Sequence, residues 1–412
     1  MKRWHIGHVG LEGAGLTSLL ILLALAMAAC GPGSQDAGTA PKTSAPPAMF
    51  RADPAHTGVY PDTGATITGQ LAWKFDTTNS VGSSPAVSGG LVYVGSNWST
   101  SGGGRNGPKG VLYAFDAASG TERWRFNAGG YMPSSPAVSG GLVYVGTGEN
   151  GHLCALDAAT GRQRWKVKTG EMYTSPAVSE GVVYSVSSGG DVYALDATTG
   201  AQRWKVKVEG LTDSCPAVSG GMVYLGATLV GDYNDQGCVY ALDAATGTER
   251  WKSKIGDVVE SSPAVSGGLV YVGVTLLGDN DVNEGYIYAL DTASGAERWK
   301  FKTSGGMRSS PAISGGLVYV GSDDGYIYAL DAATGAERWR FSAGGGIMYS
   351  SPAVSGGVIY VGSQGGYLYA LDAASGTERW KFTAGGPVYS SPAVSGGLVY
   401  VGSEDGYLYA VK

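Results

Sequence analysis

Short apolar or alternating stretches, each bounded by glycine-rich turns, follow one another from about residue 70 to the end of the chain. The segment Ser350–Phe382 is typical, and it predicts strands over 350–354, 358–363, 367–373 and 377–382. β-Branched and aromatic residues fill these stretches, and Ser, Gly and Asp separate them, as in tight turns. No ten-residue stretch after the N-terminal segment has the 3.6-residue apolar period of a helix. The pattern therefore predicts an all-β domain.

The four-strand unit recurs, and the number of repeats sets the size of the fold. Eight tryptophans recur in one context, 39 to 51 residues apart: Trp73, Trp124, Trp165, Trp204, Trp251, Trp299, Trp339 and Trp380. A proline in the sequence Pro-Ala-Val or Pro-Ala-Ile also occurs once in each unit. Four antiparallel strands in every forty residues are the pattern of a propeller blade, so the sequence predicts eight blades.

The two ends of the repeat region each hold part of one blade. The region begins with a lone outer-strand sequence around Trp73 and ends at Lys412 in a third-strand sequence. We expect these two strands to pair and close a ring of eight four-stranded antiparallel blades, because an open ring leaves unpaired sheet edges.

One spacing, Ala-x-Asp-x-x-x-Gly-x-x-x-Trp, occurs seven times without a mismatch, from Ala114–Trp124 to Ala370–Trp380. It resembles the tryptophan-docking motif of the pyrroloquinoline-quinone-like (PQQ-like) propellers, and the resemblance covers residues 70 to 412. Its implication is a propeller whose eight tryptophans pack between blades. The superfamily has an enzymatic branch, the quinoprotein dehydrogenases, which bind PQQ and calcium. It also has a non-enzymatic branch that includes the propeller lipoprotein of the outer-membrane β-barrel assembly machinery, which this chain resembles more.

The first residues do not fit the repeat. Residues 1–29 have a basic start and a short apolar run, and the box Met27-Ala28-Ala29-Cys30 resembles a bacterial lipoprotein signal. The resemblance implies cleavage before Cys30 and acylation of its sulfur. An ordinary secretory signal with an incidental cysteine is the alternative. Residues 30–48, rich in Gly, Ser, Thr, Ala and Pro, predict a flexible tether.

Residues 49–69 are expected to be a lead-in to the propeller at 70–412. The resulting hypothesis is an exported protein with a lipid anchor. The anchor would hold it on the outer leaflet of the plasma membrane or on the periplasmic face of an outer membrane.

Composition narrows the class of function. A net charge of −6 and the lack of a basic stripe argue against nucleic acid as a partner. Only four histidines occur, two of them before Cys30, so a histidine-based catalytic or zinc site is not expected. Cys154, Cys215 and Cys238 replace recurring Tyr or Ser residues, which predicts buried thiols rather than a disulfide or ligand set. We expect a monomeric propeller.

Comparison of the repeats with one another predicts two different faces. The turns after the first and third strands, 355–357 and 374–376 in the unit above, hardly change between repeats. They lie at one end of a propeller, the constant face. The connections after the second strand and between blades, such as 364–366 and 383–389, differ between repeats and lie at the other end, the variable face. Residues that vary at positions where the fold requires no particular side chain are the better candidates for binding.

Three connections on the variable face are long: 97–110, 228–237 and 275–285. The last holds oxygen-bearing side chains of the kind that calcium prefers: Asp279, Asp281, Asn283 and Glu284. The glycine and the bidentate glutamate of an EF-hand loop are not at the required spacing. A solvated acidic loop is therefore the expected alternative, and no metal site is predicted.

Another variable position lies three residues before the proline of each first strand. Six of its eight residues carry large or charged side chains: Tyr173, Asp213, Glu260, Arg308, Tyr349 and Tyr389. Because the first strand is innermost, these side chains should surround the central channel at its variable mouth and could hold a small polar ligand or a peptide tip. Alternatively, Glu260 and Arg308 pair across adjacent blades and the tyrosines fill the channel. The preceding position, Met348 in one unit, is mostly apolar.

Three functions remain. The first is a membrane-tethered, non-catalytic binding or scaffold protein that offers its variable face to a protein partner of the cell envelope, as in envelope protein assembly. The second is a PQQ- and calcium-dependent quinoprotein dehydrogenase. The chain has no vicinal cysteine pair and no insertion large enough to cover a cofactor, so no cofactor is expected. The third is a structural surface-display protein, which the near-identity of the blades favours. The sequence favours the first.

Overall fold

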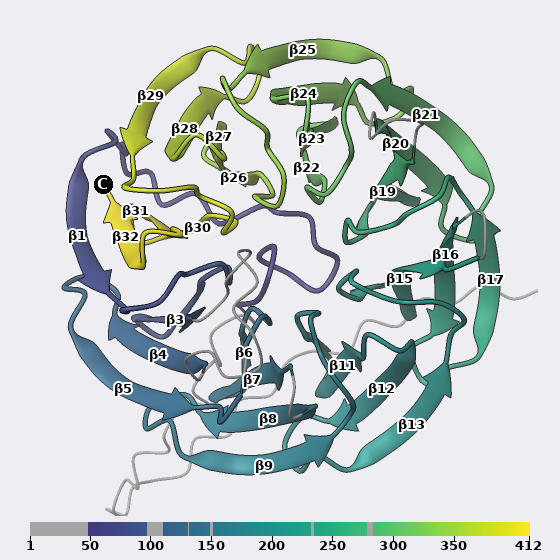
Figure 1. The fold of residues 1–412 in the computed structure, drawn as a ribbon, viewed down its shortest axis with the longest axis horizontal. Helices are drawn as coiled ribbons and strands as arrows, with labels where there is room; N and C mark the ends of the chain where they lie inside the picture. Colours follow the sequence, from purple (N-terminus) through teal and green to yellow (C-terminus); the bar gives the residue numbers. More distant parts are fainter. Residues whose placement is uncertain (1–47, 97–109, 131, 149–150, 232–234, 278–282) are drawn as a thin grey trace, which may run out of the picture. The chain divides into compact units, whose positions relative to one another are not determined.

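The computed structural model describes residues 48–96, 110–130, 132–148, 151–231, 235–277 and 283–412. All of these belong to one of two compact units of the chain, residues 44–412. They form eight four-stranded antiparallel sheets, arranged as blades around a central axis (Figure 1). Blades one to seven follow the chain order from β2–β5 to β26–β29, and blade eight consists of β30, β31, β32 and β1. The prediction of an eight-bladed propeller is confirmed.

The innermost strand of each blade is three residues long. These strands are β2 (Ala86–Ser88), β6 (Ala137–Ser139), β10 (Ala177–Ser179), β14 (Ala217–Ser219), β18 (Ala264–Ser266), β22 (Ala312–Ser314), β26 (Ala353–Ser355) and β30 (Ala393–Ser395). The expected strand over 350–354 is wrong at its start, because Pro352 has no N–H to give to a sheet ladder.

The second and third strands carry the buried apolar core of each blade. The second strands are β3 (Leu91–Ser96), β7 (Leu142–Thr147), β11 (Val182–Val186), β15 (Met222–Leu229), β19 (Leu269–Leu276), β23 (Leu317–Gly321), β27 (Val358–Gly362) and β31 (Leu398–Gly402). The third strands are β4 (Val111–Asp116), β8 (His152–Asp157), β12 (Asp191–Asp196), β16 (Gln236–Asp243), β20 (Glu284–Asp291), β24 (Tyr326–Asp331), β28 (Tyr367–Asp372) and β32 (Tyr407–Val411).

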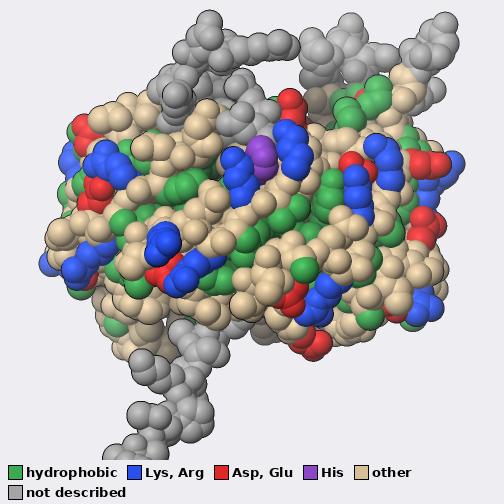
Figure 2. Space-filling view, turned by 90° about the horizontal axis from the view of Figure 1, so that it is seen from below, with side chains coloured by type: hydrophobic (Ala, Val, Ile, Leu, Met, Phe, Trp, Pro, Cys, Tyr) green, Lys and Arg blue, Asp and Glu red, His purple; other side chains and the backbone are tan. Residues whose placement is uncertain are grey.

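The outer strands form the rim of the ring. They are β5 (Glu122–Asn127), β9 (Gln163–Lys168), β13 (Gln202–Lys207), β17 (Glu249–Lys254), β21 (Glu297–Thr303), β25 (Glu337–Ser342), β29 (Glu378–Thr383) and β1 (Leu71–Asp76). Lys and Arg side chains are spread along the rim among Asp and Glu (Figure 2). Charged side chains on an edge strand discourage pairing with the sheet of another molecule.

The ring closes through the two ends of the repeat region. β1 pairs with β32, with Trp73 opposite Ala410 and Phe75 opposite Leu408. The backbone of Lys412 continues this ladder, because its N–H donates to the Gln70 carbonyl at 2.8 Å. The predicted closure is therefore present, and blade eight is assembled from segments more than 300 residues apart.

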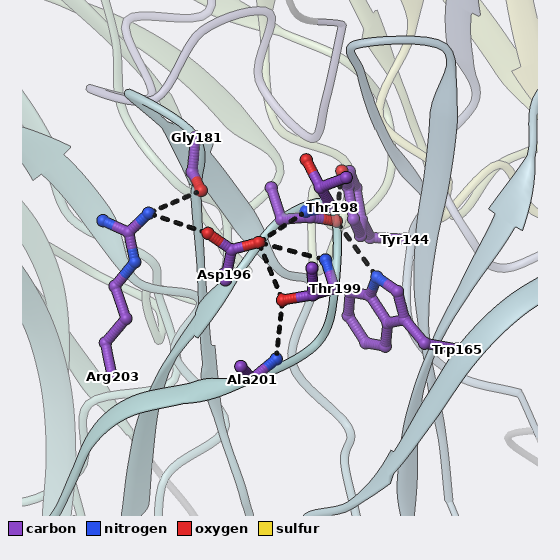
Figure 3. A network of polar contacts seen from close by, with 9 residues as sticks. Tyr144, Trp165, Gly181, Asp196, Thr198, Thr199, Ala201 and Arg203 are labelled. Atoms are coloured by element: carbon purple, nitrogen blue, oxygen red, sulfur yellow. Dashed lines mark hydrogen bonds and ion pairs between the residues drawn. The ribbon is translucent and has the colours of Figure 1, made fainter.

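Each outer-strand tryptophan docks on the constant-face turn of the next blade. Figure 3 shows this for Trp165, whose indole N–H donates to the Ala197 carbonyl at 3.0 Å. In that turn, Asp196 accepts hydrogen bonds from the Thr199 amide and hydroxyl at 3.0 and 2.9 Å. Arg203 pairs with the other oxygen of Asp196 at 3.0 Å. One turn therefore provides hydrogen-bond partners for its own backbone and a docking site for the tryptophan of the preceding blade.

The same indole hydrogen bond is made by all eight tryptophans, at 2.8 to 3.1 Å. Trp380 differs in its acceptor, because the turn of blade eight is interrupted by the chain ends. Its N–H donates to the Ile67 carbonyl, and its ring lies against Gly69. The end of the lead-in thus replaces the missing turn.

A closed circle of hydrogen bonds surrounds the channel. The backbone N–H of the residue before each blade proline donates to the side chain of the equivalent residue in the next blade, at 2.9 to 3.1 Å. These residues are Ser84, Ser135, Ser175, Cys215, Ser262, Ser310, Ser351 and Ser391. Cys215 is therefore one link in this circle. Like Cys154 and Cys238, it is a buried free thiol.

The lead-in lies across the constant-face end of the channel, near the centre of Figure 1 (purple). Its carbonyls accept hydrogen bonds of 2.6 to 2.9 Å from the innermost strands of five blades: Ala48 from Val138, Pro54 from Val218, Ala55 from Val265, Thr57 from Ile313 and Gly58 from Val354. The buried Arg51 adds a hydrogen bond of 2.8 Å to the Ser310 carbonyl. The lead-in thus forms a floor under the channel, which the repeat pattern did not predict.

Candidate binding face and channel mouth

The variable face carries two extended hairpins on neighbouring blades. β15 and β16 pair out to Leu229 and Gln236, and β19 and β20 pair out to Leu276 and Glu284. The predicted loops 228–237 and 275–285 are therefore strand at both ends, over two residues on each side, which corrects their expected bounds. The third long connection, 97–110, lies outside the described residues except for Gly110.

The linkers between blades brace both hairpins. Leu211 and Thr228 exchange two backbone hydrogen bonds of 2.8 Å, and Val258 and Thr275 exchange bonds of 3.0 and 2.9 Å. Each linker therefore adds a short bridge to the edge of its hairpin. The bridging positions fix the backbone of the variable face on blades four and five.

Large apolar side chains are exposed on this face. Among the described residues, six large hydrophobic side chains are exposed, and five of them lie on the variable face: Tyr173, Leu211, Val230, Leu277 and Tyr349. Val230 is the most exposed, at 65%, and Leu211 and Leu277 follow at 55% and 52%. These three lie on or beside the two hairpins, so the hairpins and their linkers form the most apolar part of the face.

The structure brings four of the six predicted mouth residues into one chain of contacts. The Arg308 guanidinium donates to Glu260 at 2.9 Å, across the boundary between blades five and six. It lies over the Tyr349 ring, 5.9 Å from the ring centre. Tyr349 in turn meets Tyr389 edge-on, with ring centres 5.7 Å apart. The expected alternative, an ion pair between Glu260 and Arg308, is present.

Asp323, which was not predicted from the sequence, joins this cluster. It lies between β23 and β24, and Arg308 also donates a hydrogen bond to one of its oxygens. Burial, with the neighbouring Glu260 carboxylate, raises the pKa of Asp323 to about 6 in spite of Arg308. Its other oxygen is buried and has no hydrogen-bond partner among the described residues.

Glu404 occupies in blade eight the position that Asp323 occupies in blade six. In both, the backbone N–H donates to a linker carbonyl, that of Pro387 or Gly306. Burial raises the pKa of Glu404 to about 7, and one of its oxygens is buried without a partner in the described part of the chain. A signal existed in the sequence. The residue equivalent to Asp323 is Gln364 in blade seven and Glu404 in blade eight, whereas the Ser before it and the Gly two residues after it are the same in all three blades.

The two remaining predicted residues, Tyr173 and Asp213, precede the innermost strands of blades three and four. Both are exposed to solvent at the variable end. The surrounding protein removes part of the hydration of the Asp213 carboxylate and raises its pKa. The mouth thus carries four carboxylates, those of Asp213, Glu260, Asp323 and Glu404, and one guanidinium.

The spacing from the proline predicted the wrong residue, Met348, for one buried apolar position below the mouth. Val388 fills a buried site where its amide donates to the Ser363 carbonyl. In the preceding blade Ile347, not Met348, makes the equivalent bond to Ser322 and is buried. The linker holds one extra residue between Ile347 and Tyr349, which shifts the spacing to the proline by one. This residue is Met348, and it is left half-buried.

The acidic loop considered as a weak candidate for calcium is only partly described. Asp279 and Asp281 lie outside the described residues. Glu284 lies in β20, and its carboxylate pairs with Lys302 at 2.7 Å. Asn283 precedes it directly. The described part of the chain holds no group of three or more His, Cys, Asp and Glu that is close enough to bind a metal ion.

The carboxylates of Glu260 and Asp323 do not fit a calcium ion of the kind that the dehydrogenase branch binds. At the channel mouth, Arg308 already bridges the carboxylates of Glu260 and Asp323. A calcium ion between them would have to displace this guanidinium. No catalytic step is therefore derived for the mouth.

The described residues contain no helix with the length and apolarity needed to cross a membrane. The sequence profile described as outer membrane protein assembly factor BamB matches the chain over residues 63–175, 168–237, 235–348 and 323–412. Among curated proteins, none matches the sequence.

Several solved structures share the fold. BamB from Moraxella catarrhalis has a TM-score of 0.63 and 18% identity, and the match covers 83% of this chain and 98% of that one. A europium-containing methanol dehydrogenase has a TM-score of 0.69 and 17% identity, over 86% and 89% of the two chains. The computationally designed Ika8 protein has a TM-score of 0.67 and 17% identity, over 83% and 99%. Such identities establish a common fold only. The profile, in contrast, matches nearly the whole propeller, and the chain therefore belongs to the family of the outer membrane protein assembly factor BamB.

Proposed function

We propose that this protein is a membrane-tethered, non-catalytic binding protein that holds a protein partner of the cell envelope on its variable face. The observation that carries the proposal is the distribution of exposed apolar side chains. Leu211, Val230 and Leu277 project from the variable face, on a backbone fixed by hairpins and bridges. Exposed apolar side chains on a rigid surface are typical anchors of protein–protein interfaces.

The channel mouth adds a charge preference to this face. Four carboxylates share the mouth with one guanidinium, so its net charge is negative when all are ionised. Two buried carboxylate oxygens, on Asp323 and Glu404, lack donors in the described part of the chain. A partner that joins apolar residues to a basic side chain would complement both features.

The family supports the scaffold function. BamB is named as an outer membrane protein assembly factor, and a role in envelope protein assembly is the corresponding proposal for this chain. The proposed lipid anchor at Cys30 lies outside the described residues. Ala48, where the tether would meet the propeller, lies on the constant face. Anchoring from that side leaves the variable face free, and the chain from Cys30 to Ala48 reaches at most about 60 Å.

Quantitative affinity capture from membranes tests the proposal. The triple variant L211S/V230S/L277S removes the apolar anchors and should reduce capture of the partner at least tenfold. A matched control, A159S/A245S/A374S, changes three exposed residues of the constant-face turns and should leave capture unchanged. Equal loss in both variants would contradict the proposal. Capture of no partner by the unchanged protein would favour the surface-display function.

The dehydrogenase function shares the fold and needs a separate test. Addition of PQQ and calcium should leave the melting temperature unchanged and produce no alcohol oxidation. A rise in melting temperature together with dye reduction would favour the dehydrogenase and overturn the non-catalytic proposal.

A further inference from the structure

Two basic side chains are buried close together in the lead-in. Arg51 is 3% exposed and His56 is 1% exposed. The Arg51 guanidinium donates from Nη1 to the Ser310 carbonyl at 2.8 Å and from Nη2 to the Pro311 carbonyl. Its Nε donates to the His56 carbonyl at 3.3 Å. All three acceptors are uncharged backbone carbonyls, so none of these hydrogen bonds brings a negative charge to the buried guanidinium.

The imidazole of His56 is neutral in this environment. Its Nδ1 lies 3.2 Å from the Pro263 carbonyl of blade five, which only accepts hydrogen bonds, so Nδ1 carries the hydrogen. The Phe50 ring meets the imidazole edge-on, with ring centres 5.6 Å apart. Burial, together with the Arg51 charge, lowers the pKa of His56 from 6.5 to about 3. A proton on Nε2 would therefore place a second positive charge beside the buried guanidinium.

The ionisable groups around the pair balance one positive charge but not two. Among the described residues, Asp53 is the carboxylate whose charge acts on Arg51, and no carboxylate acts in the same way on His56. Tyr60 and the Cys215 thiol of blade four also face Arg51, but burial raises the pKa of both, so they stay neutral. Arg51 keeps its own proton, although burial lowers its pKa to about 10.

The segment that carries both side chains is held by the blades rather than by its own backbone preferences. Arg51, Ala52 and His56 have φ of 63°, 73° and 57°, in the left-handed region that residues with a side chain seldom occupy. Three carbonyls of the same segment accept hydrogen bonds of 2.6 to 2.9 Å from the innermost strands of blades four, five and six. Release of the segment would relieve the backbone strain and break these three bonds together.

We propose that residues 50–57 form a pH-sensitive latch, which lies against blades four to six while the His56 ring is neutral and is released when the ring gains a proton. A histidine in solvent accepts a proton near pH 6.5, whereas the buried ring resists it until about pH 3. The stability of the latched form is therefore complete above about pH 6.5 and is lost as pH falls towards 3.

Release of the latch changes what the channel offers. The innermost strands of blades four to six then present their N–H groups, and the carbonyls of Pro263, Ser310 and Pro311, without the lead-in as a partner. A free strand edge of this kind pairs with an extended peptide. The latch therefore controls whether these edges bind a peptide inside the channel, and it does so independently of any partner on the variable face.

Amide hydrogen exchange in the full chain, measured by NMR between pH 7.5 and 4.5, tests the latch. The readouts are the amides of Val265 and Ile313, whose acceptors are the carbonyls of Ala55 and Thr57. Their protection factors, which are corrected for the intrinsic exchange rate, should fall about 100-fold, because each pH unit below 6.5 favours release about tenfold. The Val138 amide is bound outside the latch, and its protection factor should change less than threefold.

The variant H56N removes the titrating ring and keeps its structural role. Asparagine tolerates positive φ, and its side-chain amide can donate to the Pro263 carbonyl, but it does not titrate. In H56N, the protection factors of Val265 and Ile313 should stay within threefold between pH 7.5 and 4.5. The matched control H152N replaces a histidine of blade two and should keep the full 100-fold fall.

Two results would overturn the proposal. One is a protection factor at Val265 and Ile313 that does not change with pH in the unchanged protein. The other is an equal fall in H56N, which would assign the acid response to other groups. If H56N does not fold, an NMR titration of the His56 ring in the unchanged protein decides. Proton uptake that coincides with loss of protection would support the latch, whereas uptake near pH 6.5 with both amides still protected would reject it.

Discussion

The two faces of the propeller are made from the same strands but follow opposite rules. On the constant face, seven turns repeat one arrangement of Asp, Ser or Thr, Gly and Arg, and each accepts a tryptophan from its neighbour. On the variable face, linkers and hairpins differ in length, charge and apolar exposure from blade to blade. The contrast indicates that stability is concentrated at one end, which leaves the other end free to diverge.

The carboxylates of the two faces show the same contrast. Hydrogen bonds from Arg338 and Thr334 lower the pKa of Asp331, in a constant-face turn, to about 2. Burial raises the pKa of Glu404, on the variable face, to about 7. A carboxylate with a lowered pKa stabilises the fold when ionised, whereas one with a raised pKa opposes it when ionised. Raised values are more typical of binding sites than of structural ones.

Removal of a docking tryptophan should have the largest effect on stability. The Trp124 ring lies between blades one and two, so W124A should lower the free energy of unfolding by about 3–5 kcal/mol. On the variable face, Y349A should cost less than about 1 kcal/mol, because its ring is partly exposed. Urea denaturation of both variants measures the difference. Similar losses of stability in W124A and Y349A would contradict the inference that stability is concentrated on the constant face.

Glycine substitutions separate docking from backbone strain. A Cβ on Gly161, at φ +70°, would come within 2.6 Å of the Trp124 ring. G161A should therefore cost about 2–4 kcal/mol, from strain and overpacking together. Gly140 also has positive φ, at +58°, but open space around it. G140A should cost only about 1 kcal/mol. Equal urea midpoints for G161A and G140A would show that the contact with the Trp124 ring contributes little to stability.

The change of folding stability with pH should be smaller than these losses, and its sign should differ between the carboxylates of the two faces. Because the pKa of Asp331 is lowered, its stabilisation is present above pH 4 and is lost as pH falls towards 2. D331N should therefore be less stable than the unchanged protein at pH 7, and the difference in stability should disappear near pH 2.

Because the pKa of Glu404 is raised to about 7, its ionisation destabilises the fold as pH rises from about 4 to above 7. E404Q should gain about 1 kcal/mol relative to the unchanged protein between pH 4 and pH 8. A gain that is independent of pH would contradict this assignment.

The repeat made the architecture predictable from sequence. Seven copies of one spacing predicted seven docking tryptophans, because each copy solves the same packing problem. The lone outer strand at Trp73 and the third-strand sequence that ends at Lys412 predicted the eighth blade and its closure. Errors occurred where one blade departs from the others. The extra residue after Ile347 changes the spacing between a buried position and the proline. In blades four and five, each hairpin strand extends two residues into the loop that the sequence suggests.

The channel floor and the contact between Asp323 and Arg308 could not be predicted from the repeat. The lead-in is a single copy, and Arg51, Ala52 and His56 adopt positive φ, which no periodic pattern reveals. Asp323 reaches Arg308 from another connection of the same blade, so the contact depends on how two loops meet in space. Comparison between repeats identifies variable positions but not which of them touch.

The central claim is that the variable face binds and the constant face does not. Photo-crosslinking from one residue at a time in cells that make the protein tests it most directly. A crosslinker at Val230 or Leu277 should give one and the same adduct with a partner protein. A crosslinker at Ala245 or Ala374, both exposed in constant-face turns, should give none. Adducts of equal yield from both faces, or from the constant face only, would contradict the account.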